Sequence, residues 1–288
     1  MTTIREALAY GKSMLAQGGQ FNPDLDAQVL LGHVLHVERA TLYTYPERLL
    51  TAEQEQQFQQ LLKRRRQGEP VAYLIGFQEF FGLNFLVDRR VLIPRPETEL
   101  LVEAALKVIR ALLASGRPPL VADIGTGSGA IPITLAVQEP RLPYLYACDI
   151  SPDALEMAYL NCQRYRVEQR IHLLRGDLLT PLPEPVDILI ANLPYVGTNE
   201  MEILAPDVRE YEPHLALFSG PQGLDLLHRF FAEAQQPGKL QDGAVMLLEI
   251  GYQQREPLTR FLHELWPQAQ IEFEKDYAGW DRILKISP

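Results

Sequence analysis

An amide, a proline and an aromatic residue follow directly on an apolar run near the middle of the chain. In the stretch ILIANLPYV, the residues Asn192, Leu193, Pro194 and Tyr195 come immediately after a segment typical of a buried strand. A strand that ends in a turn would explain them, because Asn and Pro are common turn residues. The same residue types could also bind a planar nitrogen group, which presents N–H donors at its edge and a flat face for stacking.

A primary amide or an aromatic amine is a poor nucleophile because its lone pair is delocalised into the adjacent π system. If the side-chain oxygen of Asn192 and the backbone carbonyl of Leu193 each accept one N–H, they favour electron density on the nitrogen and aim its lone pair. Tyr195 can lie flat against the group, and Pro194 restricts Leu193 to extended conformations. We therefore expect Asn192, Leu193, Pro194 and Tyr195 to be catalytic through positioning and fixed dipoles, without a strong general base.

A glycine-rich turn, ADIGTGSGAI, lies between a predicted strand and a predicted helix. Gly125, Gly127 and Gly129 would allow a tight turn and a close approach of a ligand to the backbone. Read loosely, Gly125, Gly127 and Ala130 also fit the dinucleotide fingerprint, so the loop alone leaves a nicotinamide cofactor open. Asp149 ends the next strand, where the ribose hydroxyls of either a nicotinamide or an adenosyl cofactor would be held.

Asp123 separates these two cofactors. It lies two residues before Gly125, where we expect its carboxylate to face the ligand. There it would repel a pyrophosphate but suit a ligand that is cationic near the loop; the alternative is that it only caps the turn. S-adenosylmethionine carries an ammonium and a sulfonium and no phosphate. Asp177 and Leu178, in GDLL after the third strand, occupy the place where an adenine ring would rest, although a simple strand-end Asp is the alternative reading.

We therefore expect S-adenosylmethionine as the cofactor. The expected cofactor-binding residues are Asp123, Gly125, Thr126, Gly127, Ser128, Gly129, Asp149, Asp177, Leu178 and Asn192.

The elements that must position these residues are predicted from hydrophobic periodicity. Residues 1–75 show helical spacing and are expected to form a small helical domain. Residues 76–92 alternate around Gly82, which predicts a β-hairpin linker. In residues 93–288, strands alternate with helices, which predicts a mostly parallel sheet covered on both faces. The final segment, QIEFEKDYAGWDRILKIS, predicts two strands joined by a short turn, with the last strand antiparallel.

Composition narrows the classes of partner. The 288 residues contain 27 basic and 37 acidic side chains, a net charge of -10, whereas phosphate binding needs a basic surface. The basic run from Lys63 to Arg66 is expected to offset a helix dipole on a solvated face. Two cysteines without metal-ligand spacing predict a reducing compartment and no metal site. With no apolar segment of signal or membrane length, we expect a cytoplasmic protein that binds neither membranes nor, directly, nucleic acid.

The four residues from Asn192 to Tyr195 resemble Asn-Pro-Pro-Tyr, the signature of methyltransferases that act on planar nitrogens of amides and adenines, with Leu193 in place of the first proline. That position contributes a main-chain carbonyl in the family, which Leu193 retains. Further segments extend the resemblance over nearly the whole chain to the glutamine methyltransferases of peptide-chain release factors: IPRPETE, ADIGTGSGAI, VRxYEPxxAL, LEIGYQQ and DYAGWDR.

The resemblance implies a Rossmann-like class I methyltransferase sheet preceded by a helical substrate-recognition domain. It implies transfer of a methyl group from S-adenosylmethionine to the glutamine amide in the Gly-Gly-Gln loop of release factors, which are then the protein partners. It also implies that Gly125 to Gly129, Asp149, Leu178 and Asn192 hold the cofactor and that Asn192 to Tyr195 hold the glutamine, with Thr98 and Glu99 near the site.

Three other readings stay open at this point. An adenine methyltransferase on DNA or RNA would share the four-residue signature but would need a basic groove. A nicotinamide oxidoreductase is disfavoured by Asp123, and a non-catalytic adaptor by the intact Asn192 and Tyr195. The chain's own Gly18-Gly19-Gln20 is interpreted as the end of the first helix rather than as a substrate.

Overall fold

The computed structural model describes residues 2–17 and 22–288, so Gly18-Gly19-Gln20 lies outside the described residues. The chain forms two compact units. The first contains Met1–Phe77 together with Ala205–Tyr211, and the second contains Gln78–Leu204 together with Glu212–Pro288. The chain thus leaves the second unit once, contributes a short segment to the first, and returns.

The first unit is helical, as predicted. Its helices are α1 (Ile4–Ala16), α2 (Pro23–Leu35), α3 (Arg39–Thr44), α4 (Ala52–Arg66), α5 (Val71–Ile75) and α9 (Pro206–Tyr211). Thr3 and Thr51 each form a capping box, and Asn22 caps α2 with Pro23 at the first helical position, which satisfies N–H groups that the helices leave unpaired.

In the basic run at the end of α4, Lys63, Arg64 and Arg66 are exposed, as predicted for a solvated face, whereas Arg65 differs. Arg65 is only 6% exposed. Its guanidinium pairs with Asp26 of α2 at 2.7 Å, lies 3.5 Å from Asp207 of α9, and donates to the carbonyl of Glu69 at 3.1 Å. A buried guanidinium needs such partners, and here they join three helices of the first unit.

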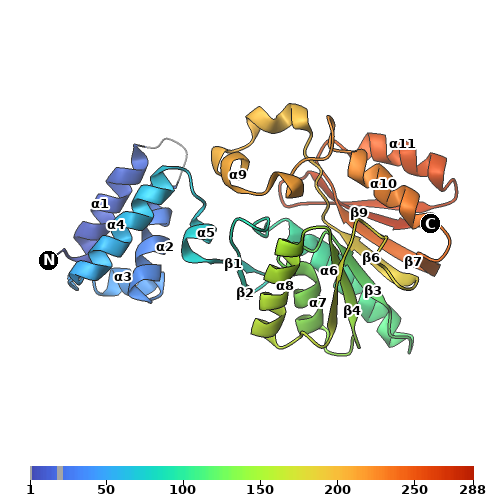
Figure 1. The fold of residues 1–288 in the computed structure, drawn as a ribbon, viewed down its shortest axis with the longest axis horizontal. Helices are drawn as coiled ribbons and strands as arrows, with labels where there is room; N and C mark the ends of the chain where they lie inside the picture. Colours follow the sequence, from blue (N-terminus) through green and yellow to red (C-terminus); the bar gives the residue numbers. More distant parts are fainter. Residues whose placement is uncertain (1, 18–21) are drawn as a thin grey trace. The chain divides into compact units, whose positions relative to one another are not determined.

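The second unit is a seven-stranded sheet in the order β5-β4-β3-β6-β7-β9-β8 (Figure 1). The strands are β3 (Val121–Ile124), β4 (Leu145–Asp149), β5 (Ile171–Arg175), β6 (Val186–Ala191), β7 (Leu240–Glu249), β8 (Gln270–Lys275) and β9 (Asp281–Ser287). Strands β3 to β7 are parallel, and β9 is antiparallel to both of its neighbours. The predicted mostly parallel sheet with an antiparallel last strand is therefore confirmed.

Helices cover both faces of this sheet. One core joins the sheet to α6 (Thr98–Ala114), α7 (Ala130–Gln138) and α8 (Pro152–Tyr165). The opposite core joins it to α10 (Asp225–Ala234) and α11 (Arg255–Leu265). Because both faces are buried, the central strands are mostly apolar rather than alternating, with Asp123 in β3 and Asp187 in β6 as charged exceptions. All six residues of β6 are buried, as the apolar run predicts.

The predicted β-hairpin is present as β1 (Phe77–Phe80) and β2 (Leu83–Leu86). The chain turns with positive φ at Phe81 and Gly82, and Phe80 and Phe85 are buried in the first of the two cores. Asn161 of α8 donates to the carbonyls of Leu86 and Ser128 at 3.0 and 2.9 Å. This side chain therefore ties the hairpin to the glycine-rich loop.

Between β6 and α10 lie elements that the sequence did not predict. They are the short helices η1 (Thr198–Ile203), α9 and η2 (His214–Ala216). Within the second unit, the amide of Gln254 donates to the carbonyls of Tyr195 and Gly223 at 3.1 and 3.0 Å. A Cβ at Gly223 would lie 1.9 Å from the Tyr195 oxygen, and this glycine has a φ of +73°. The loop after β6 is thus packed backbone against backbone.

We predict that Gly223→Ala destabilises the protein by about 2–4 kcal/mol, since both backbone strain and a collision must be relieved. Gly238→Ala is the matched control: its φ is +83°, but its added Cβ would meet nothing within 4 Å, so strain alone should cost about 1 kcal/mol. Urea unfolding of both variants measures the difference. Equal losses would contradict the close packing of Gly223 against Tyr195.

Candidate active site

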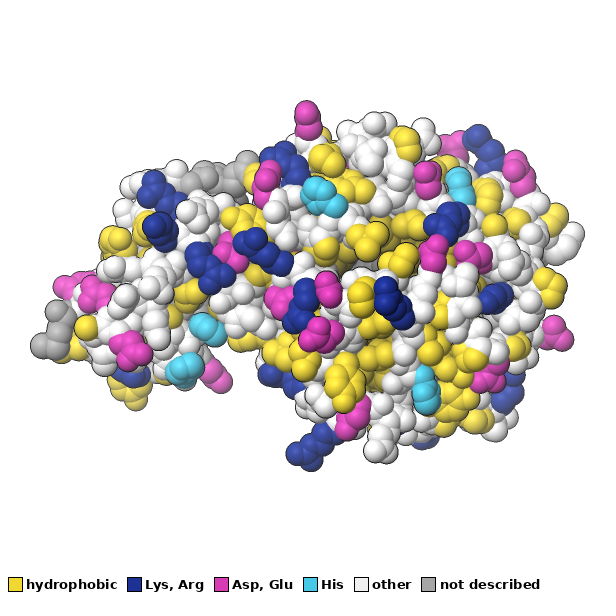
Figure 2. All heavy atoms as spheres, viewed as in Figure 1, with side chains coloured by type: hydrophobic (Ala, Val, Ile, Leu, Met, Phe, Trp, Pro, Cys, Tyr) yellow, Lys and Arg dark blue, Asp and Glu magenta, His cyan; other side chains and the backbone are white. Residues whose placement is uncertain are grey.

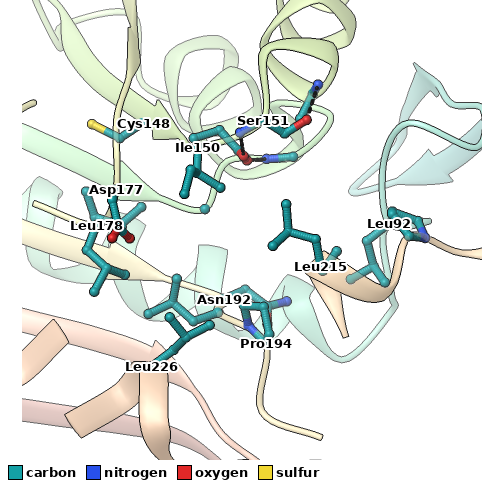
Figure 3. Close-up of a pocket in the computed structure, with 18 of the residues that line it drawn as sticks. Leu92, Cys148, Ile150, Ser151, Asp177, Leu178, Asn192, Pro194, Leu215 and Leu226 are labelled. Atoms are coloured by element: carbon teal, nitrogen blue, oxygen red, sulfur yellow. Dashed lines mark hydrogen bonds between the residues drawn. The ribbon is translucent and has the colours of Figure 1, made fainter. Parts of the chain in front are cut away.

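A cavity of about 250 Å³ opens at the carboxyl edge of the sheet (Figure 3). Parallel strands bring their carboxyl ends to one edge, where open α/β sheets bind ligands. The ends of β3, β4, β5 and β6 all contribute to the lining, together with Arg90–Leu92, two side chains of α10, and Pro213, Leu215 and Ala216. The lining is mainly apolar, and Leu215 and Leu92 lie on the side opposite Asp177 and Leu178 in Figure 3.

The three glycines of the loop after β3 play different parts. Gly125 and Gly127 line the cavity. A Cβ on Gly127 would meet nothing within 4 Å, so its backbone is open to a ligand, whereas a Cβ on Gly129 would lie 2.9 Å from the Ile133 side chain and 3.3 Å from that of Ala158. Gly129 therefore serves the packing of α7 on α8. The predicted residues Thr126 and Ser128 are buried and, like Gly129, are not among the lining residues.

Asp149 joins two loops at the cavity. One carboxylate oxygen accepts from the backbone N–H of Gly127 at 2.8 Å, and the other accepts from that of Ser151 at 2.9 Å. Burial raises the pKa of Asp149, and these backbone hydrogen bonds oppose the rise. Because Asp149 also lines the cavity, its carboxylate both fixes the glycine loop and borders the space where the sequence predicts a ribose.

Asp123 is buried, with 1% of its surface exposed, and it is not among the residues that line the cavity. Among the described residues, neither of its carboxylate oxygens has a hydrogen-bond partner, nor does the hydroxyl of Thr126. Burial raises the pKa of Asp123 to about 7; the nearby Thr126 hydroxyl opposes this rise, and the charge of Asp149 adds to it. A buried carboxylate without a donor fits a cationic ligand group as its missing partner.

The predicted adenine residues lie on the cavity wall. Asp177 and Leu178 both line it, and Leu178 holds a φ of +46°, which is uncommon for a non-glycine residue. The carboxylate of Asp177 pairs with the guanidinium of Arg229 of α10, which also lines the cavity. Arg229 could not be identified from the sequence, because its place in the site depends on tertiary packing.

Asn192, Leu193 and Pro194 also line the cavity, and Asn192 and Pro194 lie close together in Figure 3. The side-chain nitrogen of Asn192 donates to Thr98 Oγ1 at 3.0 Å and to Glu249 Oε2 at 3.1 Å. Glu249 ends β7 and was not predicted to be a site residue. The available signal was an acid at the end of the apolar run AVMLLEIG, at the same sheet edge as Asn192.

Tyr195 is not among the lining residues. Its hydroxyl donates to Glu249 Oε1 at 2.8 Å. Burial and the charge of Glu249 both raise the pKa of Tyr195, so the hydroxyl stays protonated. The contact of its ring with a planar substrate group remains a prediction.

Thr98 and Glu99, the two residues of the IPRPETE segment that were expected near the site, have different partners in the structure. Thr98 is buried and donates to Glu249 Oε2 at 2.6 Å. Glu99 instead accepts from the backbone N–H of Phe81 in the hairpin turn at 2.9 Å, so it holds the hairpin rather than the site. Glu212, of the VRxYEP segment, is buried, accepts from the N–H of Ile93, and pairs with Arg95, which joins two of the motifs beside the cavity.

Two further properties concern only the described residues. No group of three or more metal-ligating side chains is placed to hold a metal ion among residues 2–17 and 22–288. None of the helices in that part of the chain has the length and apolar character that crossing a bilayer requires.

Curated relatives cover almost the whole chain. It is 41% identical over 283 residues to the release factor glutamine methyltransferase of Moorella thermoacetica, which covers 98% of this chain and 97% of that protein. It is 37% identical to the enzyme of that name from Bacillus cereus, with 98% of both chains covered. It is 35% identical to the one from Rhodopirellula baltica, with 99% of this chain and 96% of that protein covered.

Among solved structures, the hMettl16 catalytic domain in complex with the MAT2A 3′UTR hairpin 6 superposes with a TM-score of 0.57 at 18% identity, covering 72% of this chain and 76% of that one. That likeness concerns the fold alone. Two family descriptions match separate parts of the sequence: the PrmC N-terminal domain matches residues 6–76, and the methyltransferase small domain matches residues 98–206. With near full-length relatives at these identities, the chain belongs to the release factor glutamine methyltransferase family.

Proposed function

We propose that this protein transfers a methyl group from S-adenosylmethionine to the side-chain amide nitrogen of the glutamine in the Gly-Gly-Gln loop of peptide-chain release factors. The observation that carries the proposal is the side chain of Asn192, which borders the cavity while its nitrogen is bonded to Thr98 and Glu249. The relatives named above support the same reaction.

The residues of the cavity fit S-adenosylmethionine, which supplies an electrophilic methyl group on a sulfonium when bound. The backbone at Gly127 is open to close approach, and Asp149 is placed to accept from ribose hydroxyls. Asp123 is not among the lining residues, but it lies two residues before Gly125, and the negative charge of its buried carboxylate suits the positive charge of the cofactor. Asp177 and Leu178 border the part of the cavity assigned to the adenine.

The acceptor nitrogen is activated by position. The oxygen of Asn192 and the carbonyl of Leu193 accept the two N–H groups of the substrate amide, so its lone pair faces the methyl group. No strong base is needed, because the nitrogen becomes acidic once it is alkylated. Alignment of this kind can supply up to about 7–11 kcal/mol of the barrier in ideal cases.

A release factor fits the charge of this protein better than a nucleic acid does. On the face drawn in Figure 2, acidic and basic side chains of the described residues are interspersed rather than gathered into a broad basic surface, and the net charge is -10. The two arginines that line the cavity, Arg90 and Arg229, are paired with carboxylates. We therefore infer that the enzyme makes no direct contact with nucleic acid.

We further infer a role for each part of the chain. Residues 1–75 recognise the release factor, residues 76–92 link them to the rest of the chain, and residues 93–288 bind the cofactor and catalyse methyl transfer. Since release factors act on ribosomes, we expect the enzyme in the cytoplasm.

Methylation of a release factor, compared with methylation of duplex DNA in the same assay and measured by mass spectrometry, tests the proposed reaction against the adenine alternative. Methyl transfer to DNA alone would overturn the proposed reaction.

Asn192→Ala should lower turnover on a release factor by about 100-fold or more, because one of the two acceptors for the substrate amide is lost. Cofactor affinity, measured by calorimetry, should stay within a few-fold. Asn199→Ala, at an exposed position of η1, is the control and should retain normal turnover. Normal turnover in Asn192→Ala would refute the assigned role.

Leu193→Pro should be tolerated or slightly raise activity, because the position contributes its backbone carbonyl and proline stiffens the loop. Steady-state kinetics and a thermal melt check this together. A folded but inactive Leu193→Pro enzyme would show that the loop follows a different backbone path.

Asp123→Asn should have opposite effects on stability and binding. The folded-state pKa of Asp123, about 7, lies above the usual value of 3.8. The contribution of Asp123 to the free energy of unfolding is therefore fully present below about pH 4 and is lost as the pH rises through 7. Removing the charge should stabilise the cofactor-free protein at pH 8 by on the order of 1–4 kcal/mol and weaken cofactor binding.

Asp149→Asn replaces one of the two carboxylate oxygens with an NH2 group, so one of the two backbone N–H groups that Asp149 accepts from loses its acceptor. This variant is the contrasting control and should lower stability. Denaturant melts at pH 5 and 8 with cofactor calorimetry measure both effects. A pH-independent effect of Asp123→Asn, with unchanged cofactor affinity, would contradict the proposed pairing.

A further inference from the structure

Three hydrogen-bond donors converge on one buried carboxylate beside the cavity. Glu249 is 1% exposed. It accepts from the hydroxyl of Thr98 at 2.6 Å, from the hydroxyl of Tyr195 at 2.8 Å, and from the side-chain nitrogen of Asn192 at 3.1 Å. The pairing of Ala191 with Leu248 in the parallel register places the next residues, Asn192 and Glu249, side by side. The cluster therefore joins β6, β7 and the start of α6.

The chemistry of these partners fixes which way the Asn192 amide faces. An ionised carboxylate can only accept hydrogen bonds, so the nitrogen of Asn192 must face Glu249. Thr98 gives its single hydroxyl proton to Glu249 and therefore accepts from the same nitrogen. Turning the amide by 180° would set its oxygen against two oxygens. The nitrogen end is thereby occupied, and the oxygen end is left for the cavity that Asn192 borders.

We propose that Glu249, with Thr98, is a positioning residue that sets the polarity of the Asn192 amide, so that the site accepts an NH2 donor and rejects a carboxylate or a carbonyl oxygen in its place. The inference rests on the proposed function and deepens it. Glu249 acts through Asn192 and touches no substrate atom, and the selection of the carboxamide nitrogen follows from its charge.

The negative charge of the Glu249 carboxylate has to be stabilised, because burial favours its neutral form. Burial raises the pKa of Glu249, and the hydrogen bonds from Thr98 and Tyr195 and the positive charge of Arg282 on β9 oppose that rise, while Glu97 adds to it. A buried carboxylate is costly unless several donors satisfy it. Three donors and a nearby guanidinium fit a group that remains ionised where the enzyme works.

The test is a double-mutant cycle between Glu249→Gln and Asn192→Ala. A neutral amide of the same shape can donate as well as accept, so it no longer fixes the direction of Asn192. Glu249→Gln alone should lower kcat on a release factor by about 10- to 100-fold, as loss of an outer partner of a functional side chain commonly does, with cofactor affinity within a few-fold. In the Asn192→Ala background the same change should lower kcat by less than about two-fold.

Binding without turnover gives a second readout. Calorimetry with S-adenosylhomocysteine present compares release factors that carry Gly-Gly-Gln or Gly-Gly-Glu. The wild type should prefer the glutamine form, and Glu249→Gln should reduce that preference by about five-fold or more. Glu256→Gln is the matched control: its side chain is 86% exposed and pairs across one turn with Arg260, and both readouts should stay at wild-type values.

Equal losses in both backgrounds, or an unchanged preference for glutamine, would overturn the role of Glu249. Full activity of Asn192→Ala would instead overturn the proposed function, so the two failures are distinguishable. If Glu249→Gln does not fold, Thr98→Val and Thr98→Ser replace it. Thr98→Val should reduce kcat and the glutamine preference, and Thr98→Ser, which keeps the hydroxyl, should restore both; indistinguishable Thr98 variants would contradict the proposal.

Discussion

A carboxylate buried among three hydrogen-bond donors holds the end of β6 to the end of β7. Removed from water, Glu249 has to be satisfied by Thr98, Tyr195 and Asn192. Each bond also fixes the donor, and one of those donors is the amide that borders the cavity. The buried charge of Glu249 thus determines which end of the Asn192 amide faces the cavity, where the substrate is assigned.

The register of the parallel strands brings the two halves of the proposed reaction together. The loop after β3 and the end of β4 form the side of the cavity assigned to the cofactor, joined by the contacts of Asp149 with Gly127 and Ser151. The end of β6 forms the side assigned to the amide. Because all these strands run in one direction, their ends meet at one edge.

Sequence patterns predicted the fold well where the signal was local. The apolar run of β6, the capped helices and the hairpin around Gly82 all form as predicted, and the ends of β3 to β6 converge. Patterns were less informative where the answer depended on tertiary neighbours. Gly129 belongs to a ligand motif by spacing, yet it serves helix packing. Arg65 was predicted to be solvated but is buried between two carboxylates.

Glu249 shows the same limit most clearly. Its position after an apolar run marks it as a strand-end acid, but its significance comes from the neighbouring strand, and the register that makes Asn192 its neighbour is not visible in either segment alone. Asp123 was predicted from spacing to face a cationic ligand, but the structure buries it outside the lining of the cavity. Its interaction with the cofactor stays a prediction.

The most direct test is a crystal structure of the enzyme with S-adenosylhomocysteine and a release factor. We predict that the glutamine nitrogen lies within about 3.2 Å of both Asn192 Oδ1 and the Leu193 carbonyl, with the Asn192 nitrogen still bonded to Glu249. A glutamine bound away from residues 192–195, or an Asn192 amide turned with its nitrogen toward the substrate, would contradict the account.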